Sequence, residues 1–122
     1  MKLCSGVDLI EIERVREAIE RHGERFLNRV FTRIELTEAE NDPASLAARF
    51  AAKEAVAKAL GTGIGVVCWQ EIEIRRGPAR QPQLHLHGNA AQLARELGLV
   101  DWSISLSHTH RTAIAMAVGT GA

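Results

Sequence analysis

At the centre of the chain stands the segment Arg49-Phe50-Ala51-Ala52-Lys53-Glu54-Ala55-Val56-Ala57-Lys58-Ala59-Leu60-Gly61-Thr62-Gly63. Most of these residues are good helix formers, and the glycines that follow are typical of a helix end. Glu54 and Lys58 are four residues apart, so a helix places them on one face, where they are expected to pair. The segment therefore predicts an alanine-rich helix with a carboxylate beside an ammonium group, next to a flexible loop. That combination suits a metal-bound phosphate ester.

Signals for further helices precede this segment. Asp42 can cap the long helix and Pro43 is tolerated in its first turn, which predicts a helix over residues 44–60. Residues 32–35 have the spacing of a capping box and predict a short helix. The apolar residues of 12–22 recur at helical spacing and stop at Gly23, and residues 26–31 add one or two further turns.

Strand signals dominate the second half of the chain. We expect a strand at residues 2–9, with Asp8 at its end, and others at 66–74, 84–87, 102–107 and 112–118, with a helix at 90–97. Helices followed by a strand-rich half favour an α+β fold in which an antiparallel sheet packs on a long central helix. The length fits one domain over residues 1–122, and no linker divides it.

Composition narrows the function classes. The chain has 15 basic and 15 acidic residues, so it lacks the basic field expected for nucleic-acid or anionic-membrane binding. No apolar run approaches the roughly 18 residues of a membrane span, and Lys2 places a charge too early for a signal sequence. Cys4 and Cys68 do not make a disulfide framework. We therefore expect a cytoplasmic protein that binds neither nucleic acid nor membrane.

Acidic and basic residues suggest a phosphate site. Asp8 and Glu54 could together supply two oxygen ligands to Mg²⁺, which proteins usually bind through one or two carboxylates. Alternatively, Asp8 caps a helix and Glu54 makes only a helix pair with Lys58. Arg49, Lys53 and Lys58 could neutralise phosphates or simply face solvent. The loop 61–65 is either a glycine helix cap or a surface for a ligand lying across the helix end.

Two other patterns carry rival hypotheses. His85 and His87, and likewise His108 and His110, form His-x-His pairs that could chelate a transition metal on a strand. Ser107 beside His108 lacks a nucleophile elbow, which argues against a serine hydrolase. A third pattern is cationic: Arg14, Arg21 and Arg25 follow helical spacing, and such a face could bind an acidic partner helix or be merely solvated.

Taken in order, the motifs resemble the holo-acyl-carrier-protein synthase family of phosphopantetheinyl transferases. The resemblance runs from end to end through these segments: Gly6-Val7-Asp8, Glu11-Ile12-Glu13-Arg14, Arg49 to Ala55, Lys58 with Gly61 to Gly65, and Ser105-Leu106-Ser107-His108-Thr109. It implies transfer of 4′-phosphopantetheine from coenzyme A to a serine of an apo acyl carrier protein, with release of adenosine 3′,5′-bisphosphate. It also implies the small transferase fold of that family.

The resemblance assigns roles to individual residues. It implies that Asp8 and Glu54 ligate Mg²⁺, that Glu54 accepts the serine proton directly or through a water, and that Lys58 stabilises the departing phosphate. Coenzyme A contacts are implied for Arg49, Lys58, Gly61, Gly63, Pro82, His108 and Thr109. Arg14, Arg21 and Arg25 correspond to the basic face that receives the carrier protein. The chain departs from the family pattern at Arg80-Gln81, where a Gly-Lys pair is usual.

The family is typically a homotrimer with each active site shared between subunits, so we expect the same here. Two alternatives remain at this stage. One is a non-catalytic subunit that binds carrier protein or coenzyme A. The other is a histidine metal-binding protein built on the two His-x-His pairs.

Overall fold

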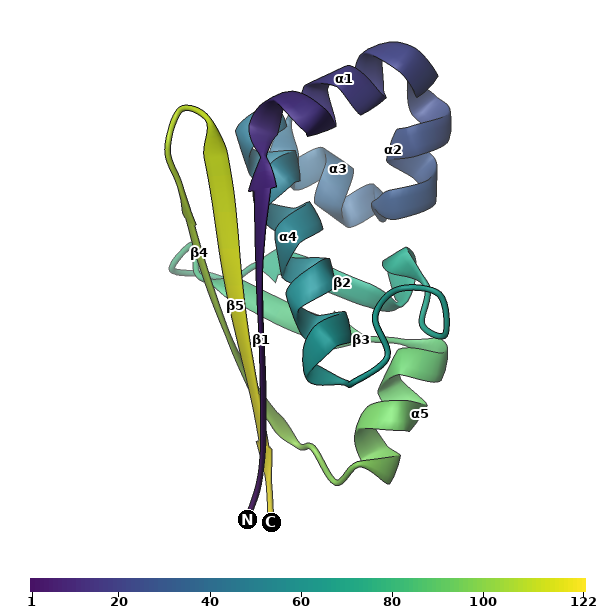
Figure 1. Cartoon of the computed structure of the whole chain (residues 1–122), viewed down its shortest axis with the longest axis vertical. Coiled ribbons are helices and arrows are strands. Elements are labelled where there is room, and N and C mark those ends of the chain that lie inside the picture. Colours follow the sequence, from purple (N-terminus) through teal and green to yellow (C-terminus); the bar gives the residue numbers. More distant parts are fainter.

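The computed structural model describes all 122 residues, as five strands, five α-helices and one 3-10 turn (Figure 1). In chain order the elements are β1 (Lys2–Glu11), α1 (Ile12–His22), α2 (Glu24–Val30), α3 (Arg33–Ala39), α4 (Pro43–Ala59), η1 (Trp69–Glu71), β2 (Ile72–Arg76), β3 (Pro82–Leu86), α5 (Gly88–Glu96), β4 (Asp101–His108) and β5 (Thr112–Gly121). The expected α+β class is confirmed. None of the helices combines the length and the apolar character that a membrane span requires.

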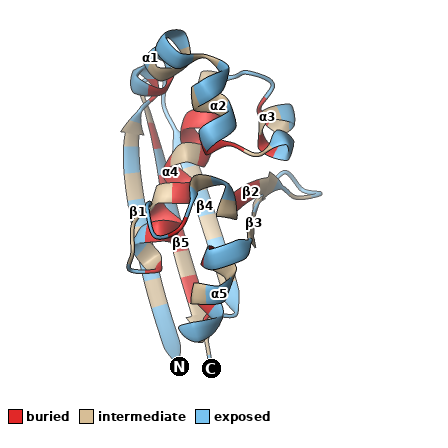
Figure 2. Ribbon diagram, turned by 90° about the vertical axis from the view of Figure 1, so that its right-hand side faces the viewer, coloured by how far each residue is buried: buried red, intermediate tan, exposed pale blue.

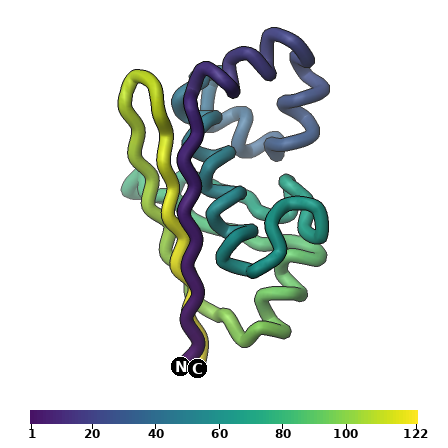
Figure 3. Tube along the Cα trace, viewed as in Figure 1, coloured from purple at the N-terminus to yellow at the C-terminus, as the bar shows by residue number.

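The strands form two antiparallel sheets instead of one. The larger sheet has the order β1-β5-β4, and the smaller sheet is the pair β2-β3. β1 pairs with β5 along its whole length, from Lys2 opposite Gly121 to Glu11 opposite Thr112. The two chain ends therefore lie side by side (Figure 3). This long ladder extends both strands beyond their predicted ends, and Asp8 lies within β1 and not at its end.

Helix α4 occupies the middle of the molecule. Asp42 caps it by accepting a hydrogen bond from the Ala44 N–H at 3.2 Å, and Pro43 is its first residue, as predicted. Its side chains are buried on most sides, between the larger sheet, the smaller sheet and the helices α1 and α3 (Figure 2). Alanine fills much of this position because a small side chain lets neighbouring elements approach from several directions.

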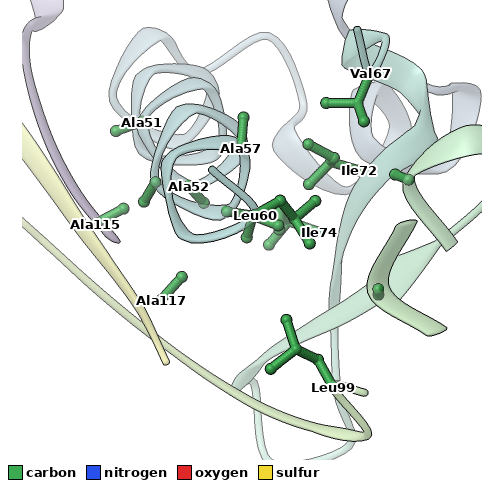
Figure 4. Close-up of a cluster of buried hydrophobic side chains, with 14 residues drawn as sticks. Ala51, Ala52, Ala57, Leu60, Val67, Ile72, Ile74, Leu99, Ala115 and Ala117 are labelled. Carbon is green, nitrogen blue, oxygen red and sulfur yellow. The ribbon is translucent and has the colours of Figure 1, made fainter. Parts of the chain in front are cut away.

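Two apolar clusters meet at α4. One lies between α4, both sheets and α5 and includes Leu60, Ile72, Ile74 and Leu99 (Figure 4). The other joins the opposite end of α4 to α1, α2 and α3 around Phe31. α4 therefore acts as the shared wall of both cores, and every residue that it presents to a site is held on a rigid element.

The prediction of a strand over residues 66–74 is wrong in its first part. Residues 66–71 form a turn and the 3-10 segment η1, and β2 begins only at Ile72. The carbonyl oxygens of Trp69 and Ile72 both accept hydrogen bonds from the Lys53 ammonium group, which curls this segment towards α4. Glu73, which lies between Ile72 and Ile74 in the sequence, is also buried and accepts hydrogen bonds from Thr32 Oγ1 and Arg75 Nε.

Gly6 allows β1 to lie directly against α4. A Cβ at this position would overlap the carbonyl oxygen of Ala55 and crowd the Ala59 nitrogen, both of which are backbone atoms that cannot rotate away. We expect Gly6→Ala to destabilise the protein by about 1–3 kcal/mol, as other overpacked cores are, and to reduce activity because Asp8 would move away from α4. Thermal unfolding measures the first effect. Ser5→Ala, at an exposed neighbouring position, should change neither property.

Candidate functional site

Asp8, Glu54 and Lys58 meet where β1 crosses α4. The close approach at Gly6 brings β1 onto the face of α4 that carries both other residues. Lys58 Nζ lies 3.1 Å from Asp8 Oδ1 and donates to the Val7 carbonyl oxygen at 3.0 Å. The expected helix pair of Glu54 with Lys58 is therefore replaced by a pair between Lys58 and Asp8. The reason is tertiary: β1 offers the ammonium group a carboxylate and a carbonyl together.

The electrostatics of this site favour the binding of a cation. Partial burial raises the pKa of Glu54, the nearby Asp8 carboxylate raises it further, and Lys58 lowers it only in part. Two carboxylates, Asp8 and Glu54, thus lie close enough to affect each other, and Lys58, the one cation that acts on Glu54, forms its ion pair with Asp8. Oxygen donors in this arrangement fit Mg²⁺, for which Asp8 and Glu54 would be the protein ligands. No group of three or more His, Cys, Asp or Glu side chains in the structure could hold a metal ion, so this chain would offer such an ion no more than two carboxylates here.

Glu54 also lines a hollow of about 310 Å³ between β1, α1, α2 and α4. Its walls are mostly apolar and include Phe26 and Phe50, with Arg14 at the side of α1. Arg21 lies in the last turn of α1. The expected continuous basic face ends there, because Gly23 terminates α1 and Arg25 lies on α2 in a different direction. Of the three arginines, only Arg14 shares a cavity with Glu54.

A second cavity, of about 290 Å³, collects three of the residues for which the resemblance implied coenzyme A contacts. Arg49, Pro82 and His108 line it together. Arg49 is only 5% exposed, and its guanidinium group is held by Ile74 O at 3.1 Å, Ser45 Oγ at 2.7 Å and Glu38 Oε1 at 2.8 Å. Arg49 is thus an anchored cation and not a solubilising one.

Three further arginines complete the charge of this cavity, and the sequence analysis did not assign them. Arg75 and Arg76 come from β2, and Arg80 from the turn that leads to β3. Asp42 is the only carboxylate among the lining residues. The signal was present in the sequence as three arginines around the Gly77-Pro78 turn. Arg80 also belongs to the Arg80-Gln81 pair, at which the chain departs from the Gly-Lys pair usual in the family. It lines the same cavity as Pro82.

The remaining expected contacts lie at element ends. Gly61 and Gly63 have positive φ values of 84° and 67°, and their N–H groups bond back to the carbonyl oxygens of Lys58 and Ala57. They form the cap of α4, so the helix-cap interpretation is confirmed. The Thr109 hydroxyl accepts hydrogen bonds from the N–H groups of Arg111 and Thr112 and shapes the turn between β4 and β5.

The two candidate sites are separate in one chain. The cavity that contains Glu54 and the cavity that contains Arg49 share no residue. β1, which carries Asp8, and β4, which carries His108, lie on opposite sides of β5 (Figure 1). One chain therefore presents an acidic half-site at the junction of β1 and α4 and a cationic half-site next to β4.

The histidine pairs do not form a metal centre. His87 Nε2 lies 3.1 Å from Glu73 Oε1, while His108 Nδ1 lies 3.2 Å from the Thr109 carbonyl oxygen. His85 lines a different cavity, between β3 and β4. Since no group of three or more His, Cys, Asp or Glu side chains could hold a metal ion, the structure gives the histidine metal hypothesis no support.

Comparisons with known proteins identify the family of the chain. A family model for the 4′-phosphopantetheinyl transferase superfamily matches residues 5–117. The chain is 50% identical to the holo-[acyl-carrier-protein] synthase of Herpetosiphon aurantiacus, over 98% of this chain and 99% of that protein. It is 53% identical to that of Moorella thermoacetica, over 95% and 92%. Among solved structures, the Helicobacter pylori holo-[acyl-carrier-protein] synthase in complex with coenzyme A matches with a TM-score of 0.88 and 30% identity, over 95% of this chain and 99% of that one. The chain belongs to the holo-[acyl-carrier-protein] synthase family of the 4′-phosphopantetheinyl transferase superfamily, a family of enzymes.

Proposed function

We propose that this enzyme transfers 4′-phosphopantetheine from coenzyme A to a serine hydroxyl of an apo acyl carrier protein in a Mg²⁺-dependent reaction. The second product would be adenosine 3′,5′-bisphosphate. The observation that carries the proposal is the convergence of Asp8, Glu54 and Lys58 at one junction of β1 and α4. Phosphoryl transfer depends mainly on positioning and charge neutralisation, which this group of side chains can supply.

In this proposal Glu54 acts as the general base. It accepts the proton of the attacking serine hydroxyl, directly or through a water, while the hydroxyl oxygen attacks the β-phosphorus of coenzyme A. In the metal-free site, burial and the Asp8 carboxylate raise the pKa of Glu54, so this carboxylate takes up a proton more readily than an exposed glutamate does. Lys58, 52% exposed and held by Asp8, can turn its ammonium group to the phosphate that leaves. A bound Mg²⁺ on Asp8 and Glu54 would neutralise the pyrophosphate charge.

The cationic cavity is proposed to receive the 3′-phosphate of coenzyme A. Arg49, His108 and the arginines of the β2-β3 hairpin line it, and guanidinium groups bind phosphate through paired hydrogen bonds. The separation of this cavity from Glu54 in one chain supports the expectation of a homotrimer with shared active sites. In such an assembly a neighbouring subunit would bring its cationic half-site to the acidic half-site of this one.

The carrier protein is proposed to dock on α1. Its acidic recognition helix would meet Arg14 and Arg21, and the apolar hollow beside Glu54 would take an apolar side chain of the same helix. Arg25 on α2 would contribute from the second helix of this surface. The serine would then arrive next to Glu54, the residue that this hollow shares with the acidic half-site.

Mass spectrometry tests the reaction directly. An apo acyl carrier protein incubated with coenzyme A, Mg²⁺ and the enzyme should gain about 340 Da, our estimate for one phosphopantetheine arm. The gain should disappear when a chelator removes the metal. If fatty-acid, polyketide and peptide-synthase carriers all stayed unmodified, the alternative of a non-catalytic subunit that binds carrier protein or coenzyme A would replace the proposal. Sedimentation of the active species tests the trimer, which a fully active monomer would exclude.

A further inference from the structure

One edge of β2 is bound by side chains and not by another strand. β2 pairs with β3 on its other edge, with Ile72, Ile74 and Arg76 opposite Leu86, Leu84 and Pro82. Pro82, opposite Arg76, has no N–H and cannot donate a hydrogen bond to Arg76. This fits a pair of residues whose backbone groups point away from each other. The backbone groups of Ile72, Ile74 and Arg76 therefore face α3 and α4. Such an open edge usually needs protection from solvent or from another strand.

Four charged side chains occupy this edge in alternation. Lys53 Nζ donates to Ile72 O at 2.6 Å, and Glu35 Oε2 accepts from Ile74 N at 2.8 Å. Arg49 Nε donates to Ile74 O at 3.1 Å, and Glu38 Oε1 accepts from Arg76 N at 2.9 Å. Successive positions thus meet a cation, an anion, a cation and an anion. We call these four residues the charge ladder.

The members of the charge ladder also pair with one another. Glu35 and Lys53 form an ion pair of 2.8 Å in which both side chains are fully buried. Glu38 and Arg49 form a second pair of 2.8 Å, in which the Glu38 side chain is 24% exposed. Each carboxylate therefore links a cation of α4 to a backbone N–H of β2. Because these contacts recur at every second residue of β2, sliding the strand by one residue would break all of them.

The charge ladder ends at the cationic cavity. Arg49 belongs to both, and Arg76, the last residue on the ladder edge, lines the cavity with its side chain. Glu38 Oε1 is shared by the Arg49 guanidinium group and the Arg76 N–H, so one carboxylate fixes the relative position of two cavity arginines. Glu35, Glu38 and Lys53 do not line the cavity themselves.

We propose that Glu35, Glu38 and Lys53 are positioning residues that fix β2 against α4 and thereby set the guanidinium groups of Arg49 and Arg76 for binding a phosphate. The proposal deepens the proposed function, because it rests on the assignment of this cavity to the 3′-phosphate of coenzyme A. In this arrangement the selectivity for that phosphate depends on residues that never touch it.

Glu38→Ala tests the proposal, because Glu38 is partly exposed and its loss should leave the fold intact. Calorimetry would compare the binding of adenosine 3′,5′-bisphosphate with that of adenosine 5′-monophosphate. The wild type should prefer the bisphosphate by about 10-fold or more, since oriented guanidinium–phosphate bonds are strong. Glu38→Ala should reduce the preference to about two-fold, with the affinity for the monophosphate unchanged. Glu71→Ala is the matched control, because Glu71 also accepts two backbone N–H bonds but lies outside the cavity.

Amide hydrogen exchange gives a second readout that does not depend on any ligand. The Arg76 N–H should exchange slowly in the wild type and faster in Glu38→Ala, while Ile74, which Glu35 holds, stays protected. Glu38→Gln keeps an oxygen acceptor and should restore slow exchange at Arg76. The proposal is overturned if Glu38→Ala keeps the full preference, if it loses affinity for both nucleotides equally, or if the wild type shows no preference.

These outcomes are separable from those of the proposed function. If the wild type prefers the bisphosphate but modifies no carrier protein, the proposed transferase function fails and the positioning role of the charge ladder is retained. If the wild type is active but its Glu38→Ala variant keeps the preference, the positioning role fails and the transferase function is retained.

Discussion

Glu54→Gln is expected to lower the rate of carrier-protein modification by about 1,000-fold, within the range that a general base contributes. The substitution keeps the size and shape of the side chain but removes the proton acceptor and one expected oxygen charge for Mg²⁺. Single-turnover transfer, followed by mass spectrometry of the carrier protein, measures the loss. Glu96→Gln, which changes an exposed glutamate on α5, serves as the control and should retain the wild-type rate.

The same variant should be at least as stable as the wild type. Burial and the Asp8 carboxylate raise the pKa of Glu54 in the folded protein, so the ionised form of Glu54 opposes folding. This cost is absent below the ordinary glutamate pKa and grows as the pH rises through the raised value. Without Mg²⁺ in the buffer, the melting temperature of Glu54→Gln relative to the wild type should therefore be higher at pH 7 than at pH 4. A variant that lost stability at pH 7, or that kept its rate, would contradict the role given to this residue.

Local signals in the sequence predicted most of the fold. Asp42 and Pro43 at the start of α4, the capping box at Thr32 and the stop at Gly23 all act through neighbouring residues. For that reason they could be recognised without knowing the rest of the structure. The prediction that Asp8 and Glu54 come together could not be derived in this way. That prediction came from the resemblance to a family. The structure shows the physical reason, because Gly6 lets β1, which carries Asp8, lie directly against α4, which carries Glu54.

Long-range contacts explain what the sequence patterns missed. Ile72 and Ile74 alternate with charged residues, a pattern typical of a strand with one solvent-facing side. Glu73 is nevertheless buried, where Thr32, which is distant in sequence, donates a hydrogen bond to it. The pairing of Lys58 with Glu54 followed from helix geometry alone, whereas β1 offered Lys58 a better partner. Arg75, Arg76 and Arg80 were overlooked because three arginines near a turn are usually solvated. Only the fold of the hairpin brings them to Arg49.

Lys53→Met is expected to destabilise the protein by about 3–5 kcal/mol, the usual cost of removing one partner of a buried ion pair. Lys53 is fully buried, and its ammonium group meets Glu35 at 2.8 Å and the carbonyl oxygens of Trp69 and Ile72 at 3.0 and 2.6 Å. Removing it would leave the Glu35 carboxylate buried without a counter-charge. Denaturant unfolding measures the loss. Lys53→Met combined with Glu35→Leu should recover part of it, because no unpaired charge then remains.

Lys58→Met is the matched comparison, because it makes the same change five residues along the same helix. Its ammonium group is half exposed and pairs with Asp8 at the surface, so its loss should cost less than about 1 kcal/mol. The effects on transfer should run the other way, with Lys58→Met impaired in turnover while fully folded. As cations of one alanine-rich segment the two lysines look alike. Lys53 is buried and stabilises the fold, whereas Lys58 is exposed and accessible for the role that we propose for it at the leaving phosphate. Equal losses of stability in the two variants would mean that the buried Lys53–Glu35 pair contributes no more to the free energy of unfolding than the exposed Lys58–Asp8 pair. That result would contradict the role of Lys53 in fixing β2 against α4.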